Sequence, residues 1–283
     1  MPKASLIISV FRKKEELELI FSALKQQTFT EFEVIVADDD SGNDMPAHVE
    51  ELKGKYKLDS RIVTHSFTGF GKNIILNRAV MSARTDYLVF IDGDCIPHRG
   101  FMEGHMRERG ANRILCGRRV MLGEKLSASL KEDHAVIGRG RISYFSLLGD
   151  MFSKPNGGYH TEEGLYISSG MIRKMRGTEI TLSGCNFSLH KKLMEKINGF
   201  DEDYTGPGIG EDSDLEFRLR LAGAELRSVR NLAVLYHVYH PLTTENNRNW
   251  EHFHEVAQKS GTYFCKNGLI KTNEQKVKGI PEK

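Results

Sequence analysis

Short apolar segments that alternate with helical patterns are the feature of this chain that most constrains its fold. Residues 5–11, 32–40, 61–66 and 87–94 form the apolar segments. They are short, mostly rich in β-branched residues and apolar on both faces, which is typical of strands buried inside a parallel sheet. Segments with helical apolar spacing separate them, at 13–27, 46–56 and 71–84. This alternation implies right-handed crossovers and predicts an α/β fold whose mostly parallel central sheet is flanked by helices.

The overall composition narrows the class of protein. Of the 283 residues, 39% are hydrophobic and 28% charged, and the net charge is only +2. Such a balance gives no reason to expect nucleic acid as a partner. Apolar stretches fall short of the roughly 20 residues that a membrane span needs, and the N-terminal residues lack a signal-peptide pattern. Four scattered cysteines without a CxxC pair favour free thiols in a reducing compartment. We therefore expect a cytoplasmic protein.

Acidic residues follow two of the expected strands directly. Phe11, Asp38–Asp40 and Asp92–Asp94 all lie at carboxyl ends of strands, where open parallel sheets bind their ligands. Taken alone, the segment around Asp39 is more typical of a turn than of a binding site. Asp92 and Asp94 differ, because two carboxylates that end a buried strand repel each other unless a cation or a shared proton compensates. Since residues i and i+2 of an extended chain point to one side, we expect both carboxylates to offer oxygens to one hard divalent cation, with Gly93 allowing close approach.

A second acidic pair stands downstream. Glu211 and Asp212 follow the glycine-rich stretch TGPGIG and begin an expected helix at 211–223. They could simply complement the helix dipole, as acidic residues in first turns do. A strand-like run then ends in His237 and His240. Histidine is a frequent ligand of transition metals, and a structural role stays equally open for each of the two.

A phosphatase of the haloacid-dehalogenase type is an alternative. Its first aspartate after an apolar strand is a nucleophile, a role that Asp92 would take here. In that class the motif sits on an early strand, whereas three strand–helix units precede Asp92 in this chain.

Three segments of the chain, taken together, resemble family 2 glycosyltransferases of the GT-A fold. The similarity is greatest to bacterial chondroitin-polymerase-type domains and to polypeptide N-acetylgalactosaminyl and β-1,4-galactosyl transferases. The segments are 5–41, 69–101 with "FIDGDCIP", and 182–229 with "SGCNFSLHKK" and "GED". A DxD motif alone is common, but the order and spacing of these motifs over most of residues 4–240 is specific.

The resemblance implies a role for each matching residue. Residues near the end of the first strand, together with Asp39 and the helix that follows residue 71, would hold the nucleotide: Ser9, Phe11, Glu16, Asp39, Lys72, Asn77 and Arg78. Asp92, Gly93 and Asp94 match the DxD motif, with Asp94 as the chief metal ligand, and His237 would complete the metal site with His240 as the fallback. Gly184, Cys185 and Asn186 would line the donor-sugar pocket. Asp212 matches the catalytic base and Glu211 its acidic neighbour at the acceptor.

The chain also departs from the family pattern. Family members often carry a tryptophan before GED, whereas the only tryptophan of this chain is Trp250. The resemblance therefore does not indicate the identity of the acceptor. Cys185 replaces a frequent glycine and would narrow the donor pocket. The region 124–176 has no clear counterpart, and its basic and aromatic residues could line an acceptor site, face a membrane or be a solvated insertion.

The resemblance implies an inverting, metal-dependent hexosyltransferase of bacterial polysaccharide or lipopolysaccharide-type synthesis. It would move a sugar from a UDP-sugar to a hydroxyl of a glycan or lipid-linked acceptor, with Mn²⁺ preferred to Mg²⁺ because the ligands mix oxygen and nitrogen. A non-catalytic nucleotide-sugar-binding module is a further alternative. We expect one catalytic domain at 1–240, with a nucleotide-sugar half at 1–115 and an acceptor half at 116–240, and a helical or flexible tail at 241–283. Peripheral membrane contact and a homo-oligomer stay open.

Overall fold

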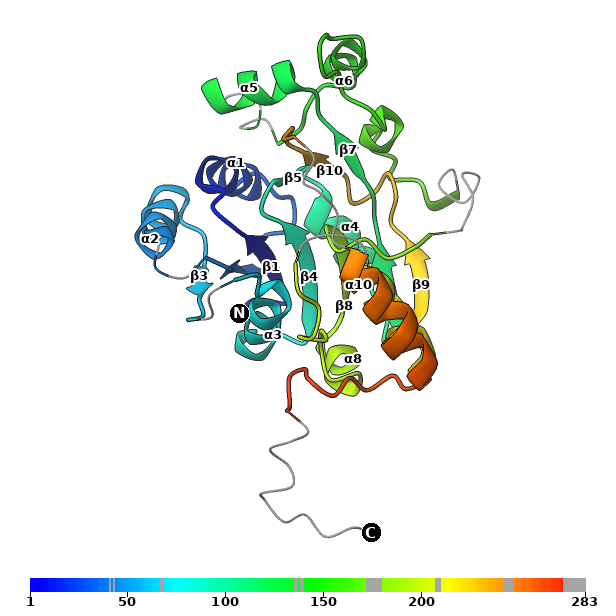
Figure 1. Ribbon diagram of the computed structural model, residues 1–283. Helices are drawn as coiled ribbons and strands as arrows, with labels where there is room; N and C mark the ends of the chain where they lie inside the picture. Colours follow the sequence, from blue (N-terminus) through cyan, green and yellow to red (C-terminus); the bar gives the residue numbers. More distant parts are fainter. Residues whose placement is uncertain are drawn as a thin grey trace, which may run out of the picture.

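A seven-stranded sheet forms the centre of the molecule (Figure 1), with the strand order β3-β2-β1-β4-β8-β6-β9. Its strands are β1 (Ala4–Val10), β2 (Phe32–Asp38), β3 (Ser60–Val63), β4 (Tyr87–Asp92), β6 (Arg113–Cys116), β8 (Asn186–His190) and β9 (Glu225–Ser228). Neighbouring strands are parallel except for β8, which runs antiparallel to both β4 and β6. The prediction of an α/β fold with a mostly parallel central sheet is confirmed.

This computed structural model describes residues 1–40, 42, 44–66, 69–134, 137, 140–171, 180–206, 210–241 and 247–271. Several sequence expectations lie outside the described residues: positions 207–209 of the glycine-rich stretch, positions 172–176 of the unmatched region, and positions 242–246 and 272–283 of the tail.

A smaller, three-stranded sheet lies beside the first. It consists of β5 (Cys95–Pro97), β7 (Arg119–Met121) and β10 (Leu235–His237), with β10 in the middle. The strand expected over 231–240 is thus shorter than predicted. Its first part turns instead, because the backbone N–H groups of Leu232 and Ala233 both donate to the carbonyl oxygen of Val229. In this small sheet β5, which follows β4 closely, pairs with β10, which lies about half the chain length further along the sequence.

Helices cover both faces of the central sheet (Figure 1). They are α1 (Lys14–Leu24), α2 (Met45–Tyr56), α3 (Lys72–Ser82), α4 (Phe101–Glu108), α5 (Glu124–Glu132), α6 (Tyr144–Met151), α8 (Lys191–Lys196), α9 (Glu211–Leu221) and α10 (Asn247–His252). A 3-10 turn at Thr161–Gly164 and a π-helical turn at Phe253–Gln258 complete the elements. Apolar residues of α1, α2, α4, α5 and α6 belong to one buried cluster, and those of α3, α8 and α9 belong to the other.

The strands supply both clusters because successive side chains point to opposite faces of a sheet. In β1, Leu6 and Ile8 join the first cluster while Ile7 joins the second. Burying each such side chain contributes roughly 1.5–3 kcal/mol. The apolar character on both faces, visible in the sequence, follows directly from this arrangement.

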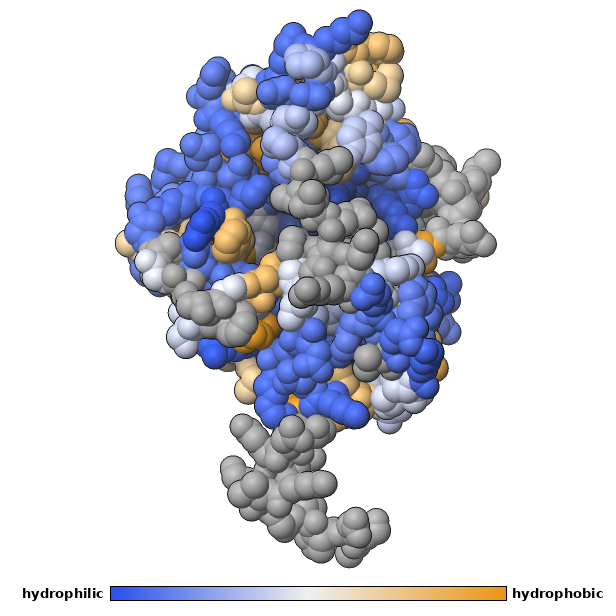
Figure 2. Space-filling view, in the orientation of Figure 1, coloured by the Kyte–Doolittle hydropathy of each residue, from blue (hydrophilic) through white to orange (hydrophobic). Residues whose placement is uncertain are grey.

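The part of the unmatched region that the structure describes contains α5 and α6. Hydrophilic residues cover most of the face seen in Figure 2, with an apolar patch over α6 at the top. Phe145 and Phe152, at the two ends of α6, are largely exposed. Within the described residues, no helix is both long and apolar enough to cross a bilayer.

Candidate active site

The turn after β4 packs directly against the end of β1. In the parallel register of these strands Ser9 lies beside Asp92, and the N–H of Gly93 donates to the carbonyl oxygen of Ser9 at 2.7 Å. A Cβ atom added to Gly93 would lie 2.8 Å from that oxygen. Glycine is therefore required for the turn to sit this close, and the turn carries two aspartates to the rim of the sheet.

Asp94 faces a group of cationic and imidazole side chains. Its carboxylate oxygens lie 3.4 Å from Nε2 of His237, 3.3 Å from Nε2 of His240 and 3.5 Å from Nζ of Lys13. His237 reaches it through the small sheet, where β10 pairs with β5 and places His237 opposite Cys95. Both histidines proposed from the sequence therefore meet Asp94, and neither has to be chosen over the other.

The protonation states of His237 and Asp94 suit metal ligands, whereas the hydrogen bond with Asp94 raises the pKa of His240. Burial lowers the pKa of His237 to about 4, so its ring is neutral at pH 7. Burial opposes ionisation of Asp94, but the hydrogen bond with His240 and the charges nearby outweigh it and hold the Asp94 pKa well below its usual range. A neutral imidazole and an ionised carboxylate are the forms that bind metals.

Asp94, His237 and His240 can hold a divalent ion. One carboxylate oxygen and one nitrogen of each ring lie within 4.8 Å of one another. The buried Nδ1 of His237 has no hydrogen-bond partner among the described residues. A mixed oxygen and nitrogen set that leaves coordination positions open fits an ion such as Mn²⁺.

Asp92 lies in different surroundings from Asp94. Its carboxylate is 3.7 Å from Nζ of Lys72 and 3.7 Å from a guanidinium nitrogen of Arg119. The sequence predicts that the carboxylates of Asp92 and Asp94 bind one cation. In the structure, Asp92 lies beside Lys72 and Arg119 instead. The reason is local: β4 ends at Asp92 and the chain turns at Gly93, so Asp92 and Asp94 are no longer alternate residues of one extended strand.

Lys72 links Asp92 to the second acidic pair. Its Nζ lies 2.7 Å from Oε1 of Glu211 as well as 3.7 Å from Oδ1 of Asp92. The other oxygen of Glu211 is buried and has no hydrogen-bond partner among the described residues. Lys72 is the first residue of α3 and Glu211 is the first residue of α9. Their ion pair therefore joins the N-terminal ends of the two helices.

Asp212 is a half-buried carboxylate with the properties of a general base. Its Oδ2 accepts the N–H of Gly184 at 2.7 Å, and a Cβ added to Gly184 would lie 2.5 Å from Oδ1. Burial raises the Asp212 pKa to about 6, with Lys72 opposing the shift and Glu211 adding to it. A base of this pKa is mostly ionised at pH 7 and still accepts a proton readily.

A cavity of about 580 Å³ opens beside these residues. Seven of the residues expected to hold the donor line it: Ser9, Phe11, Asp39, Lys72, Asp92, Gly93 and Asp94. A smaller pocket shares Ser9, Lys72 and Asp92 with it and adds Gly184, Glu211 and Asp212. The two acidic motifs therefore border adjoining spaces.

Asp39 lies at one end of the larger cavity and is buried. Its carboxylate accepts the N–H of Gly71 at 2.9 Å and lies 2.7 Å from Nε2 of His65. Burial raises the pKa of Asp39, and His65 opposes the shift. The backbone at the start of α3 and one histidine thus fix its orientation.

Four expected donor contacts lie elsewhere. The carboxylate of Glu16, on α1, lies 2.7 Å from the ammonium group of Lys131, on α5. Asn77 is buried and exchanges two hydrogen bonds of 2.9 Å with the backbone of Phe200. Asn186 is fully buried and its amide donates to two backbone carbonyl oxygens, those of Arg118 and Ala233. The two asparagines hold the framework, because their amide groups are already satisfied inside the protein. Arg78 likewise binds the carbonyl oxygen of Thr64.

Three further residues contact the site but were not predicted from the sequence: Lys13, His65 and Arg119. Lys13 follows the first strand closely and could have been found from that position. His65 lies at the end of the expected strand at 61–66, and Arg119 belongs to a segment without a recognisable pattern. Only the tertiary structure brings them to Asp39 and Asp92.

Comparison with known proteins identifies similar sequences. The profile of the family described as Glycosyl transferase family 2 matches residues 5–197, and that described as N-terminal domain of galactosyltransferase matches residues 173–241. An uncharacterized glycosyltransferase of Bacillus subtilis (strain 168), YfnE, is 26% identical over 278 residues, covering 84% of this chain and 65% of that protein. Chondroitin synthase of Escherichia coli is 24% identical over 245 residues, covering 82% of this chain and 34% of that protein. The chain thus spans between one third and two thirds of the length of these relatives.

Solved structures share the fold. GalNAc-T7, solved with UDP, GalNAc and Mn²⁺, aligns with a TM-score of 0.61 at 11% identity, covering 90% of this chain and 48% of that one. The architecture is therefore the GT-A fold that the sequence resemblance implied.

Proposed function

Because the chain belongs to glycosyl transferase family 2, we propose that it moves a hexosyl group from a UDP-sugar to a hydroxyl group of a glycan or lipid-linked acceptor, with inversion. One observation carries this proposal: Asp212, with its pKa raised to about 6, and Asp94, which belongs with His237 and His240 to the Asp94 group, line adjoining cavities that share Ser9, Lys72 and Asp92. A base for the acceptor thus stands beside a place for the donor.

The larger cavity would hold the nucleotide. Phe11 offers an exposed ring at its wall and Asp39 a fixed carboxylate, which suits a base and its ribose. Lys72 adds a positive charge where a diphosphate would lie. UDP in the GalNAc-T7 structure and the similarity to chondroitin synthase support a UDP-sugar and a role in polysaccharide or lipopolysaccharide-type synthesis.

Asp94, His237 and His240 would hold a divalent ion, with Mn²⁺ preferred to Mg²⁺. When bound, such an ion neutralises the charge that develops on the departing diphosphate. Magnesium prefers oxygen ligands and near-ideal octahedral geometry, whereas two imidazole nitrogens favour manganese. The Mn²⁺ in the GalNAc-T7 structure supports the same choice.

Asp212 would take the proton of the acceptor hydroxyl group as the oxygen attacks the anomeric carbon. The N–H of Gly184 holds one carboxylate oxygen and leaves the other for the acceptor. Glu211, paired with Lys72, stands beside it to contact the acceptor. One base and a single displacement predict inversion, so an α-linked donor gives a β-linked product.

The surroundings of the site disfavour the alternatives. A haloacid-dehalogenase-type nucleophile at Asp92 would have to attack from between Lys72 and Arg119, and family membership points elsewhere. A degenerate binding module would have no need for a carboxylate whose pKa is raised to about 6 beside a donor cavity. All four cysteines are buried free thiols, which supports the expected reducing, cytoplasmic compartment.

A thermal-shift screen tests the proposal. UDP-, GDP- and dTDP-sugars are added with and without Mn²⁺, and stabilisation scales with donor affinity. We expect UDP-sugars to raise the melting temperature most, and only with Mn²⁺ present, followed by release of UDP when an acceptor is supplied. Stabilisation by GDP- or dTDP-sugars alone would overturn the donor class, and phosphate release from a monoester would revive the phosphatase.

A further inference from the structure

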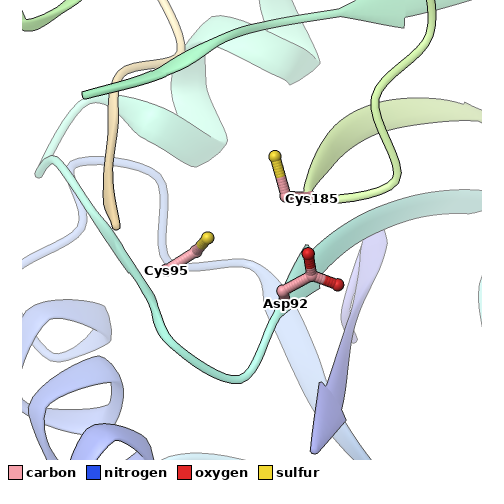
Figure 3. Close-up of side chains that lie close together, drawn as sticks. All are labelled: Asp92, Cys95 and Cys185. Carbon is pink, nitrogen blue, oxygen red and sulfur yellow. The ribbon is translucent and has the colours of Figure 1, made fainter. Parts of the chain in front are cut away.

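The thiols of Cys95 and Cys185 lie close to the carboxylate of Asp92 (Figure 3). In the antiparallel register of β4 and β8, Ile91 lies opposite Asn186, so Asp92 and Cys185 are the next facing pair. Cys95 returns to the same place after the turn at Gly93. Cys95 and Cys185 are almost completely buried, whereas the Asp92 side chain reaches the cavity.

The three side chains are spaced like the ligands of one ion. Both Sγ atoms and one oxygen of Asp92 lie within 4.8 Å of one another. Three atoms so spaced all lie within about 2.8 Å of one common point, while zinc–sulfur and zinc–oxygen bonds are about 2.3 and 2.1 Å long. Inward shifts of about half an ångström would complete a site. Cys95 and Cys185 are both free thiols and form no disulfide.

The charges around the three ligands also fit a cation. Two thiolates and a carboxylate carry three negative charges, and a divalent ion supplies two positive ones. Arg119, 3.7 Å from Asp92, supplies the third. Since buried charge is costly unless compensated, this balance matters. The thiols would release their protons to solvent as the ion binds.

We propose that Asp92, Cys95 and Cys185 form a second metal site, which takes a thiophilic ion such as Zn²⁺ and is distinct from the Asp94–His237–His240 group. Thiolate ligands select zinc or cadmium, whereas the oxygen and nitrogen ligands of the other group suit manganese. Asp92 lines the donor cavity, so the ion enters from there. Its occupation draws Asp92 away from Lys72 and inhibits donor binding, a consequence that rests on the proposed function.

Titration with Co²⁺ tests the site without any assay of activity. The purified, reduced protein should develop a thiolate-to-cobalt charge-transfer absorption that saturates at one ion per chain and disappears when Zn²⁺ displaces the cobalt. Cys95 also donates its thiol hydrogen to Oδ1 of Asp94 at 3.5 Å, so it is the loss of the band in Cys185→Ser, whose thiol is not part of the Asp94–His237–His240 group, that separates the two sites. Absence of the band in the unmodified protein overturns the site, whatever the variants do.

Cysteine variants assign the ligands. Cys95→Ser and Cys185→Ser should each abolish the band. The matched control is Cys265→Ser, which removes another buried thiol, one that donates to the carbonyl oxygen of Asn198 away from the site. A band that persists in either Cys95→Ser or Cys185→Ser, or is lost in Cys265→Ser, overturns the assignment.

A second measurement separates the site from the function. With saturating Mn²⁺, Zn²⁺ should inhibit UDP-sugar binding, and the half-inhibiting concentration should rise about tenfold or more in Cys95→Ser, relative to that variant's own uninhibited binding. A cobalt band without any turnover of nucleotide sugars supports the second metal site and contradicts the proposed function. A cobalt band with donor binding unaffected by Zn²⁺ overturns the inhibitory role alone.

Discussion

The ammonium group of Lys72 lies 2.7 Å from Oε1 of Glu211, although 139 positions separate the two residues in the chain. The same group is 3.7 Å from Asp92. Burial opposes its charge, yet Glu211 and Asp92 keep the Lys72 pKa well above its ordinary value. One cation therefore couples Asp92, which lines the larger cavity, to the acidic pair at the start of α9.

Replacing Lys72 with methionine should damage both halves of the site. Lys72→Met leaves Glu211 buried without its cation, at a cost of about 1–3 kcal/mol in the free energy of unfolding. It also removes the positive charge that holds down the Asp212 pKa. We expect weaker UDP-sugar binding and lower kcat, measured by calorimetry and steady-state kinetics. Lys192→Met, at an exposed lysine, serves as the control, and equal effects in both variants would contradict the coupling.

Replacing Asp212 with asparagine should separate binding from chemistry. Asparagine keeps the shape of the side chain but cannot accept the acceptor proton, so kcat should fall by about 10²–10⁴-fold. Binding of UDP should stay within about twofold, because Asp212 lines the smaller pocket and not the larger one. Asp86→Asn changes an exposed carboxylate and should act like the unmodified protein. Full activity in Asp212→Asn would remove Asp212 as the base.

The rate should depend on pH through Asp212. The base works only when deprotonated, and its pKa is raised from 3.8 to about 6. The value of kcat/KM should therefore be level above about pH 7 and fall about tenfold per unit below about pH 6. Saturating Mn²⁺ keeps protonation of His240 from producing the same fall. Lys72→Met should move the acid limb to higher pH, and a rate that stays level down to about pH 4.5 would refute the raised pKa.

Adding one methyl group at Gly184 should displace the base. The new Cβ would lie 2.5 Å from Oδ1 of Asp212, closer than two non-bonded atoms can come. We expect Gly184→Ala to lower kcat by about 10²-fold while UDP binding changes little. Gly149→Ala is the matched control, since nothing lies within 4 Å of its added Cβ. Unchanged kcat in Gly184→Ala would show that the position of Asp212 is not critical.

Removing either imidazole should weaken metal binding. His237→Ala and His240→Ala each delete one of the three ligands that lie within 4.8 Å of one another. We expect the Kd for Mn²⁺, measured by electron paramagnetic resonance, to rise about 10–100-fold in each variant. His160→Ala changes an exposed histidine and should leave the Kd unaltered. Normal Mn²⁺ affinity in both site variants would exclude the Asp94 group as the metal site.

Much of this organisation could be read from local patterns. The alternation of strands and helices fixed the rim at which Asp39, Asp92 and Asp94 lie, because parallel strands deliver their carboxyl ends to one edge. Motif order along the chain also led to the correct family, which the match over residues 5–197 confirms. Asn77 and Asn186 show the limit of such reasoning. Each lies within a matching motif, but their amides bind the protein's own backbone.

The sequence by itself determined the α/β framework and the acidic residues at its rim, since side-chain periodicity and strand ends are local properties. The tertiary structure alone decided how the charges are distributed. A turn at Gly93 sends Asp94 to His237 and His240 and leaves Asp92 to Lys72 and Arg119. Such pairings depend on the direction of the chain after a strand ends and on contacts between distant segments. Neither is encoded in the spacing of residues along one stretch of chain.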